Sequence, residues 1–252
     1  MTEPILQVRG LSKNFGGLTA VDDVSIDVRV DELHAVIGPN GAGKTTLLNM
    51  LSGDLFPTAG TILFHNTDIA PLAPERRSLL GVGRSYQKVN IFPRFSALEN
   101  CRLAAQSRDP RPLNWLRSAM LYEGVLENAR RALLSVGLAD RASAVASTLS
   151  HGEQRQLEIA MALATGPQLL LLDEPLAGMG TEESLNMVEL IGRLAASHAI
   201  LLVEHDMDAV FRLAQILTVM VNGKVMASGP PEVIRANRDV QIAYLGSDDA
   251  VL

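Results

Sequence analysis

The fold of this chain is decided by the stretch Gly38-Pro39-Asn40-Gly41-Ala42-Gly43-Lys44-Thr45. It has the pattern G-x-x-x-x-G-K-T, in which glycines let successive backbone N–H groups turn inward toward a phosphate. The apolar run 33–37 precedes it, and a helix is predicted from Lys44 to Leu51. In this strand–loop–helix order the loop and the N-terminus of the helix form one anion site. We predict that Lys44 reaches the β- and γ-phosphates of a nucleotide and that the Thr45 hydroxyl binds Mg²⁺.

The whole chain is long and apolar enough to bury a large core. It has 252 residues, 47% of them hydrophobic, enough for one large domain or two closely packed lobes. No apolar run reaches the roughly 18 residues of a membrane span and no signal peptide pattern opens the sequence, so we expect a soluble cytoplasmic protein. The net charge of −6 gives no support for a nucleic-acid partner. The single cysteine, Cys101, excludes an internal disulfide, and we predict that it is a packed apolar residue.

Residues 5–30 alternate between apolar and polar, which predicts antiparallel strands ahead of the phosphate-binding loop. The pairs Gly16-Gly17 and Asp22-Asp23 predict turns in this region. Phe15 stands beside the first of these turns. Two interpretations of Phe15 are open: a residue packed in a hairpin, or an aromatic face on which a nucleobase stacks.

Three short elements are expected after the first helix. The segments are a strand over Thr61 to His65, a helix over Pro71 to Arg77 and a strand over Gly81 to Gln87. Gln87 ends the last strand. It is either an ordinary strand-end glutamine or, in a nucleotide site, a contact for Mg²⁺ or the attacking water.

Helical spacing dominates from Ser96 to Thr148. One face of a predicted helix carries Val125, Ala129, Ala132, Leu133 and Val136. Pro110-Arg111-Pro112 interrupts two helical pieces. A further helix begins after Ser150, and Glu153 follows three residues later, the spacing of a capping box. Helix capping is by itself a sufficient explanation for these two residues.

Acidic residues follow a strongly apolar run in the second half of the chain. Leu169 to Leu172 lacks alternation, which is typical of a strand buried on both faces of a parallel sheet. Asp173 and Glu174 come at its carboxyl end, where such sheets bind ligands. We expect Asp173 to position Mg²⁺ and Glu174 to act as general base toward water.

A second buried strand, Ala199 to Val203, ends at His205 and Asp206. A histidine at this end of the sheet can donate a hydrogen bond to a γ-phosphate, and Asp206 is predicted to cap a helix that begins at Met207.

The C-terminal part predicts a hairpin and then helices. Asn222-Gly223 joins the strands 216–221 and 224–227. The tail from Pro230 to Leu245 is predicted to form one or two helices, and Ser247 to Leu252 to fray.

These elements predict an α/β protein with a RecA-like parallel-sheet core of the P-loop NTPase class. We expect one domain over residues 1–252, divided into an antiparallel β region (1–30 and 60–70), a nucleotide-binding core (31–59, 71–95 and 165–230), a helical insert (96–164) and a tail (231–252).

The full set of motifs resembles the ATP-binding subunits of ABC transporters, and the resemblance covers nearly the whole chain. The matching motifs are the base-stacking aromatic at Phe15, Walker A at Gly38 to Thr45, the Q-loop glutamine Gln87, the signature motif at Leu149 to Gln154, the end of Walker B at Leu172 to Pro175, and the switch histidine His205. Six motifs in the expected order and spacing are highly specific for this family.

The resemblance implies ATP and Mg²⁺ as ligands and a site shared between two subunits. The residues implied to bind ATP are Phe15, Gly38, Pro39, Asn40, Gly41, Ala42, Gly43, Lys44, Thr45 and Thr46 of one subunit, and Ser150, Gly152 and Glu153 of the other. Those implied to hold the metal are Thr45, Gln87 and Asp173, and those implied in catalysis are Glu174, His205 and Gln87.

The resemblance also implies partners and a location. The partners are a second ATP-binding subunit, identical or different, transmembrane permease subunits, and indirectly a solute-binding protein. The chain would lie in the cytoplasm, on the inner face of the cell membrane. The insert near 88–105 is expected to push on the permease, with a candidate apolar contact surface at Phe92, Pro93, Phe95 and Leu98.

Finer features resemble the subgroup that takes up branched-chain amino acids, amides or urea. They are Gly41 to Pro57, Asp173 to Met179, Val203 to Asp206 and a tail that ends near Tyr244-Leu245-Gly246. The ATPase of lipopolysaccharide export is similar in the same places and stays open. A non-transport ABC ATPase of DNA repair or translation is opposed by the single cassette and the acidic balance. A regulatory subunit with little turnover stays open because Gly180 alters the D-loop, although Glu174 and His205 argue against it.

The sequence departs from the family pattern in two motifs. His151 stands at the second glycine of the signature, and Glu153 stands where glutamine is commonest. Ser150 and Gly152 are retained, so we expect function to be intact. Gly180 occupies a D-loop position where aspartate is commonest, which puts tight communication between the two sites in doubt.

Overall fold

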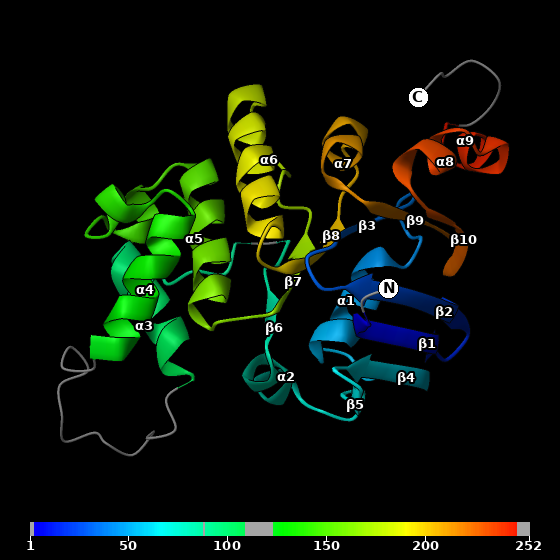
Figure 1. The fold of residues 1–252 in the computed structure, drawn as a ribbon, viewed down its shortest axis with the longest axis horizontal. Coiled ribbons are helices and arrows are strands. Elements are labelled where there is room, and N and C mark those ends of the chain that lie inside the picture. Colours follow the sequence, from blue (N-terminus) through cyan, green and yellow to red (C-terminus); the bar gives the residue numbers. More distant parts are fainter. Residues whose placement is uncertain (1–2, 88, 109–122, 246–252) are drawn as a thin grey trace.

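The computed structural model describes residues 3–87, 89–108 and 123–245, and shows two β-sheets with helices packed around them (Figure 1). The strands are β1 (Pro4–Phe15), β2 (Leu18–Arg29), β3 (Leu33–Ile37), β4 (Ala59–Phe64), β5 (Thr67–Asp68), β6 (Val82–Arg84), β7 (Leu169–Asp173), β8 (Ala199–Val203), β9 (Ile216–Val221) and β10 (Lys224–Gly229). The helices are α1 (Lys44–Ser52), α2 (Pro74–Leu80), α3 (Ala97–Gln106), α4 (Glu123–Ser135), α5 (His151–Ala164), α6 (Thr181–Ala195), α7 (Met207–Leu213), α8 (Pro231–Arg235) and α9 (Arg238–Leu245). The predicted break at Pro110-Arg111-Pro112, the end of the tail at Gly246 and the predicted fraying of 247–252 lie outside the described residues.

The smaller sheet is antiparallel, with strand order β2-β1-β4-β5. Its hairpin turns at Gly16-Gly17, as predicted. The turn predicted at Asp22-Asp23 is wrong, because both residues lie inside β2. Asp23 has a φ of 55°, and its N–H donates to the Ser12 hydroxyl at 3.0 Å. The polar pair therefore marks an irregularity within a long strand, where a side chain replaces a ladder hydrogen bond.

The larger sheet has the order β10-β9-β3-β8-β7-β6, and only β10 runs antiparallel to its neighbour. Strand β7 is buried throughout, as its unbroken apolar run predicted. Leu169 and Leu171 face the cluster that contains α1 and the smaller sheet, whereas Leu170 and Leu172 face the cluster that contains α5 and α6. The period-2 alternation of a strand thus places α1 between the two sheets, at the carboxyl end of β3.

The strand predicted over Gly81 to Gln87 is shorter than expected, since β6 ends at Arg84. The Ser85 N–H still donates to the Leu171 carbonyl at 2.9 Å. Beyond it, the Tyr86 N–H donates to Glu158 and the Tyr86 carbonyl accepts from Arg155. Side chains from α5 take over the backbone groups of Tyr86, so the segment leaves the sheet there.

Helices α3, α4 and α5 pack together at one end of the molecule (Figure 1). The predicted apolar face of α4 is buried at Ala129, Ala132 and Leu133. At its N-terminal end Leu126 is buried, while Val125 is only partly buried. Cys101 is fully buried in the same cluster, and burial raises the pKa of its thiol to about 12. Cys101 is therefore a packed apolar residue, as predicted.

The C-terminal elements follow the sequence pattern closely. Asn222 and Gly223 both have positive φ angles, 50° and 80°, as a two-residue hairpin turn requires. Asp206 caps α7 by accepting from the Ala209 N–H at 3.0 Å. Throughout the described part of the chain, no helix is both long and apolar enough to cross a membrane.

Candidate nucleotide-binding site

The phosphate-binding loop connects β3 to α1, in the order that the sequence predicted. Its glycines allow an approach to other backbone that a side chain would block. A Cβ on Gly38 would lie 2.1 Å from the Met220 carbonyl oxygen, and one on Gly43, with φ of 98°, 2.4 Å from that of Ala20. Glycine is therefore required at both positions, because the loop is pressed against β9 and β2.

The N-terminus of α1 is arranged to receive an anion. Gly43 offers no side-chain cap, and the first turn of α1 contains no acidic residue. Lys44 is buried and donates from Nζ to the carbonyls of Gly38, at 2.6 Å, and Pro39, at 3.1 Å. Burial lowers the pKa of Lys44, while the nearby carboxylates of Glu174 and Asp173 oppose that shift. Unpaired helix N–H groups beside a held ammonium are what a phosphate needs.

Asp173 lies at the carboxyl end of β7 and is almost completely buried. Its Oδ2 accepts from Arg84 Nη2 at 3.3 Å, whereas Oδ1 is buried and receives no hydrogen bond from the described residues. Burial raises the pKa of Asp173, and the guanidinium of Arg84 opposes the increase. An unpaired buried carboxylate oxygen at this edge of the sheet fits a hard cation such as Mg²⁺.

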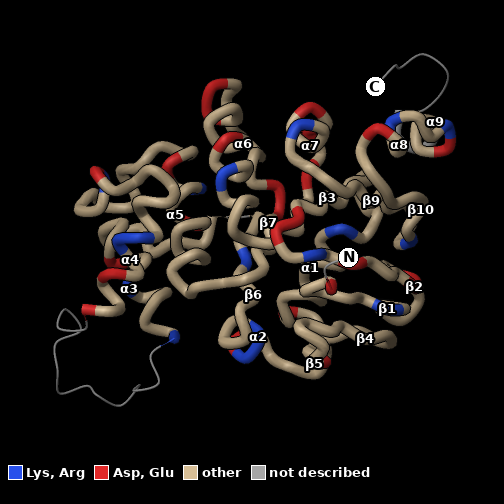
Figure 2. Tube along the Cα trace, in the orientation of Figure 1, with Lys and Arg blue, Asp and Glu red and all other residues tan. Residues whose placement is uncertain are grey.

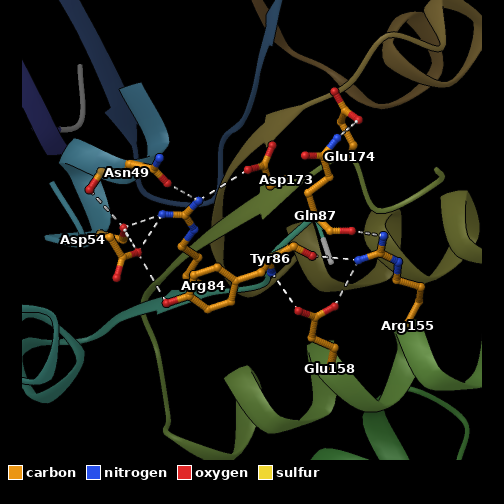
Figure 3. A network of polar contacts seen from close by, with 10 residues as sticks. Asn49, Asp54, Arg84, Tyr86, Gln87, Arg155, Glu158, Asp173 and Glu174 are labelled. Carbon is orange, nitrogen blue, oxygen red and sulfur yellow. Dashed lines mark hydrogen bonds and ion pairs between the residues drawn. The ribbon is translucent and has the colours of Figure 1, made fainter. Parts of the chain in front are cut away.

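Glu174 and Gln87 are brought into contact from segments that are far apart in the sequence (Figure 3). Gln87 Nε2 donates to Glu174 Oε2 at 2.9 Å. Glu174 has a φ of 48°, and its N–H donates to the Val203 carbonyl at 2.9 Å. A non-glycine residue in this conformation is strained, and such strain is concentrated at functional sites. The turn directs the Glu174 side chain out of the sheet toward Gln87.

Arg84 connects Asp173 to α1 and was missed by sequence reasoning. Its terminal nitrogens donate to Asn49 Oδ1 at 2.7 Å and Asp54 Oδ2 at 2.8 Å, as well as to Asp173 (Figure 3). The guanidinium also lies 4.6 Å from the centroid of the Tyr86 ring. The only signal in the sequence was its position, three residues before Gln87.

His205 is exposed just after β8, at the same edge of the sheet. The residue before it, Glu204, is fully buried and accepts from the N–H groups of Leu176, at 2.8 Å, and His205, at 3.0 Å. Burial raises the pKa of Glu204, and these backbone donors oppose the shift. Glu204 therefore ties the segment after Glu174 to the backbone of His205, a role that sequence reasoning did not assign.

The signature residues lie away from the phosphate-binding loop of the same chain. Ser150 and Glu153 form the predicted capping box, with hydrogen bonds of 3.2 and 2.8 Å, at the start of α5. Figure 1 shows α5 among the helices at one end of the molecule, whereas α1 lies beside the smaller sheet. A Cβ on Gly152 would lie 2.9 Å from Glu183 Oε1 of α6, so this position is closely packed.

Phe15 is half exposed at the end of β1, with Lys13 Nζ 5.2 Å from its ring centroid. An exposed ring contributes little to a hairpin core, which favours the second interpretation of Phe15. Together the loop, Asp173 and the edge of the parallel sheet define a nucleotide-binding protein of the P-loop class.

Comparison with known families places the chain within that class. Residues 21–177 match the family described as ABC transporter, and residues 224–250 match the family described as branched-chain amino acid ATP-binding cassette transporter. The chain therefore belongs to the ABC transporter family, in which it is the ATP-hydrolysing subunit.

Known proteins resemble the chain over nearly its whole length. The high-affinity branched-chain amino acid transport ATP-binding protein LivG of Salmonella typhimurium is 40% identical over 256 residues, covering 98% of this chain and 99% of LivG. BraF of Pseudomonas aeruginosa, of the same description, is 40% identical over 257 residues, covering 98% and 99%. A nucleotide-free ATP-binding cassette from an ABC transporter superposes with a TM-score of 0.86 at 30% identity, covering 97% of this chain and 100% of that one. The ADP conformation of MJ1267, another such cassette, has a TM-score of 0.84 at 30% identity, covering 98% and 100%. The predicted fold class and ATPase activity are confirmed.

Proposed function

We propose that this ATPase powers the import of branched-chain amino acids. The relatives named above carry that cargo in their names, and the C-terminal match belongs to the same group. Amides and urea are the other cargoes of the subgroup that the sequence resembles. Lipopolysaccharide export is disfavoured, because the relatives named above are branched-chain amino acid transport proteins. The observation that carries the chemistry is the contact between Gln87 and Glu174 beside Asp173, whose buried Oδ1 has no hydrogen-bond partner among the described residues.

ATP binds along the loop from Gly38 to Thr46, with its phosphates on the N–H groups of α1. Lys44 exchanges its two carbonyl contacts for phosphate oxygens and supplies a point charge there. The half-exposed ring of Phe15 stacks on the adenine. The residues that would hold Mg²⁺ are Thr45, Gln87 and Asp173. When bound, the ion would neutralise charge on the β- and γ-phosphate oxygens.

Hydrolysis requires a water held in line with the γ-phosphate. Glu174 orients this water and accepts its proton, while the Gln87 amide fixes the carboxylate from the other side. His205, exposed at the same edge of the sheet, donates to the γ-phosphate and steadies the transition state. Phosphoryl transfer depends mainly on positioning and charge stabilisation, and these groups supply both.

A second subunit completes the site, because the signature motif lies away from α1 in its own chain. Ser150, Gly152 and Glu153 of one subunit close over the γ-phosphate bound to the other. Subunits with Lys44→Ala should therefore regain hydrolysis when they are mixed with subunits carrying Ser150→Arg, since each mixed dimer contains one intact site. Mixtures that stay as inactive as either variant alone would argue against the shared site.

The permease docks between the core and the helical insert. A cavity of about 470 Å³ opens there, lined by Arg84 and Tyr86 on one side and by Glu158 and Met161 of α5 on the other. Beside it, Phe92 and Phe95 are exposed and stacked, with ring centroids 5.6 Å apart. The buried Asn100 holds both backbone groups of Phe92, so this pair is presented rigidly. Exposed stacked aromatics of this kind mark protein interfaces.

Docking on the permease places the subunit in the cytoplasm, at the inner face of the membrane, and a solute-binding protein delivers the cargo on the other side. Nucleic acid is not an expected partner, because Lys and Arg are interspersed with Asp and Glu along the described chain (Figure 2).

The proposal is tested by transport in cells whose own copy is replaced by Lys44→Ala. Uptake of radiolabelled leucine, isoleucine and valine should be lost. The control Lys224→Ala, which removes an exposed lysine paired with Asp22 at 3.1 Å, should retain uptake. Normal leucine uptake with Lys44→Ala, combined with loss of urea or amide uptake or of lipopolysaccharide at the surface, would overturn the proposed cargo.

A further inference from the structure

Two charged side chains on α5 are buried where α5 meets the segment that carries Gln87 (Figure 3). Arg155 is 5% exposed and Glu158 is 4% exposed. Arg155 Nη1 lies 3.2 Å from Glu158 Oε2, one turn further along the helix. No described hydrogen bond reaches Arg155 Nε, although that atom is buried. The pair is therefore an incomplete network, and apolar residues of similar size would stabilise the fold at least as well.

The two side chains hold the backbone of Tyr86 and Gln87. Glu158 Oε1 accepts from the Tyr86 N–H at 2.8 Å. Arg155 Nη1 donates to the Tyr86 carbonyl at 2.7 Å, and Nη2 donates to the Gln87 carbonyl. The planar guanidinium thus engages two successive carbonyls, which fixes both the position and the orientation of the peptide between them. This is the point where β6 has ended and the sheet no longer restrains the chain.

The other side of the same segment reaches the site. Gln87 Nε2 donates to Glu174 Oε2 at 2.9 Å, and Glu174 follows β7 directly. Helix α5, capped by Ser150, is therefore connected to Glu174 through two successive sets of hydrogen bonds: from Arg155 and Glu158 to the backbone of Tyr86 and Gln87, and from the Gln87 amide to Glu174. The Gln87 side chain joins the two sets covalently, and the buried charges strengthen the first set.

We propose that Arg155 and Glu158 act as a clamp that transfers the position of α5 to Gln87 and, through it, to Glu174. When the nucleotide bound to the partner subunit contacts Ser150, α5 moves. The clamp then moves Gln87 together with α5. Binding at one site of the dimer is thereby reported to the hydrolytic residues of the other. Arg155 and Glu158 are positioning residues, and their role rests on the functions proposed above for Gln87 and Glu174.

The test is a double-mutant cycle on the purified full-length chain, with Arg155→Lys, Gln87→Ala and the double variant. Lysine keeps a positive charge beside Glu158 but cannot donate to two carbonyls in a fixed fork. We expect Arg155→Lys to lower kcat about tenfold at unchanged ATP affinity, and to have little further effect when Gln87 is already alanine. Arg131→Lys is the matched control, since Arg131 forms an exposed ion pair on α4.

Two outcomes of the cycle would overturn the clamp. One is unchanged turnover in Arg155→Lys. The other is an equal loss of turnover in both backgrounds, which a structural role alone would produce. Thermal unfolding of each variant identifies a general loss of stability.

Amide hydrogen exchange gives a second measurement that does not depend on turnover. The Tyr86 N–H should exchange about tenfold faster in Arg155→Lys than in Arg131→Lys, and equal exchange would overturn the clamp. Normal turnover in Gln87→Ala would instead overturn the hydrolytic role proposed for Gln87. In that case the exchange rate of the Tyr86 N–H alone decides whether Arg155 and Glu158 restrain the backbone of Tyr86 and Gln87.

Discussion

Replacement of Glu174 by glutamine tests the proposed chemistry most directly. The amide has the same size as the carboxylate, so it can still accept from Gln87 Nε2, which lies 2.9 Å from Glu174 Oε2. Only the negative charge and the ability to take a proton from water are removed. The Glu174 charge is one of the causes that raise the pKa of Asp173, so the substitution also moves that pKa down.

The expected loss follows from the role of a general base. A positioned base contributes about 10²- to 10⁴-fold to kcat, which corresponds to about 2.7–5.5 kcal/mol of transition-state stabilisation. ATP affinity should be unchanged or higher, because a negative charge near the γ-phosphate is lost while the loop and Lys44 remain.

Phosphate release measures turnover, and a fluorescent ATP analogue measures binding. Size-exclusion chromatography with ATP should show dimers that persist, since they are no longer cleared by hydrolysis. Glu182→Gln is the matched control, because it removes an exposed charge from the first turn of α6 and should leave turnover unchanged. A Glu174→Gln variant with turnover within about threefold of the parent chain would refute the general-base assignment.

Three further predictions concern binding and stability. Lys44→Ala should weaken nucleotide binding at least about tenfold in an equilibrium titration, since it removes the buried ammonium; unchanged affinity would contradict the phosphate role. Phe15→Leu should change the free energy of unfolding by less than about 0.5 kcal/mol while raising the KM for ATP about fivefold; the reverse pattern would favour packing. Arg77→Met should lower the free energy of unfolding in urea by about 3 kcal/mol, because the fully buried Arg77 donates to carbonyls of α1 and of the segment before α2. The exposed neighbour Arg76→Met should cost little, and equal costs for the two would refute this account.

The sequence predicted correctly those elements that depend on residues close to one another along the chain. The strand before Gly38, the capping box at Ser150 and the hairpin turn at Asn222 all depend on residues within a few positions of one another. The prediction of a turn at Asp22-Asp23 was wrong, because the conformation there depends on a residue that is distant in the sequence. That conformation depends on the Ser12 hydroxyl from the neighbouring strand, which no local pattern contains.

Gly180, the D-loop glycine, lies at the start of α6. It is the N-cap of α6 with φ of −72° and ψ of 168°, and no side chain within the described ranges caps this helix. A Cβ at this position would meet no atom of the described residues within 4 Å. The backbone at Gly180 therefore does not require glycine. Where the family commonly has aspartate, this chain lacks both a helix cap and a side chain at the proposed subunit interface.

The sequence alone determined that a nucleotide binds here, because phosphate recognition uses backbone N–H groups that are contiguous along the chain at Gly38 to Thr45. It also predicted Asp173 and Glu174 as site residues, since a buried parallel strand delivers its last residues to one edge of the sheet. The contacts that support these residues depend on how the chain folds. Arg84, Arg155 and Glu158 act on partners far away in the sequence, and a charged residue inside a helix or at a strand end has no local sign of its partner. The contacts of Arg155 and Glu158 arise from the packing of α5 against the segment after β6, and those of Arg84 from the packing of β6 beside β7 and α1. Both are properties of the folded chain.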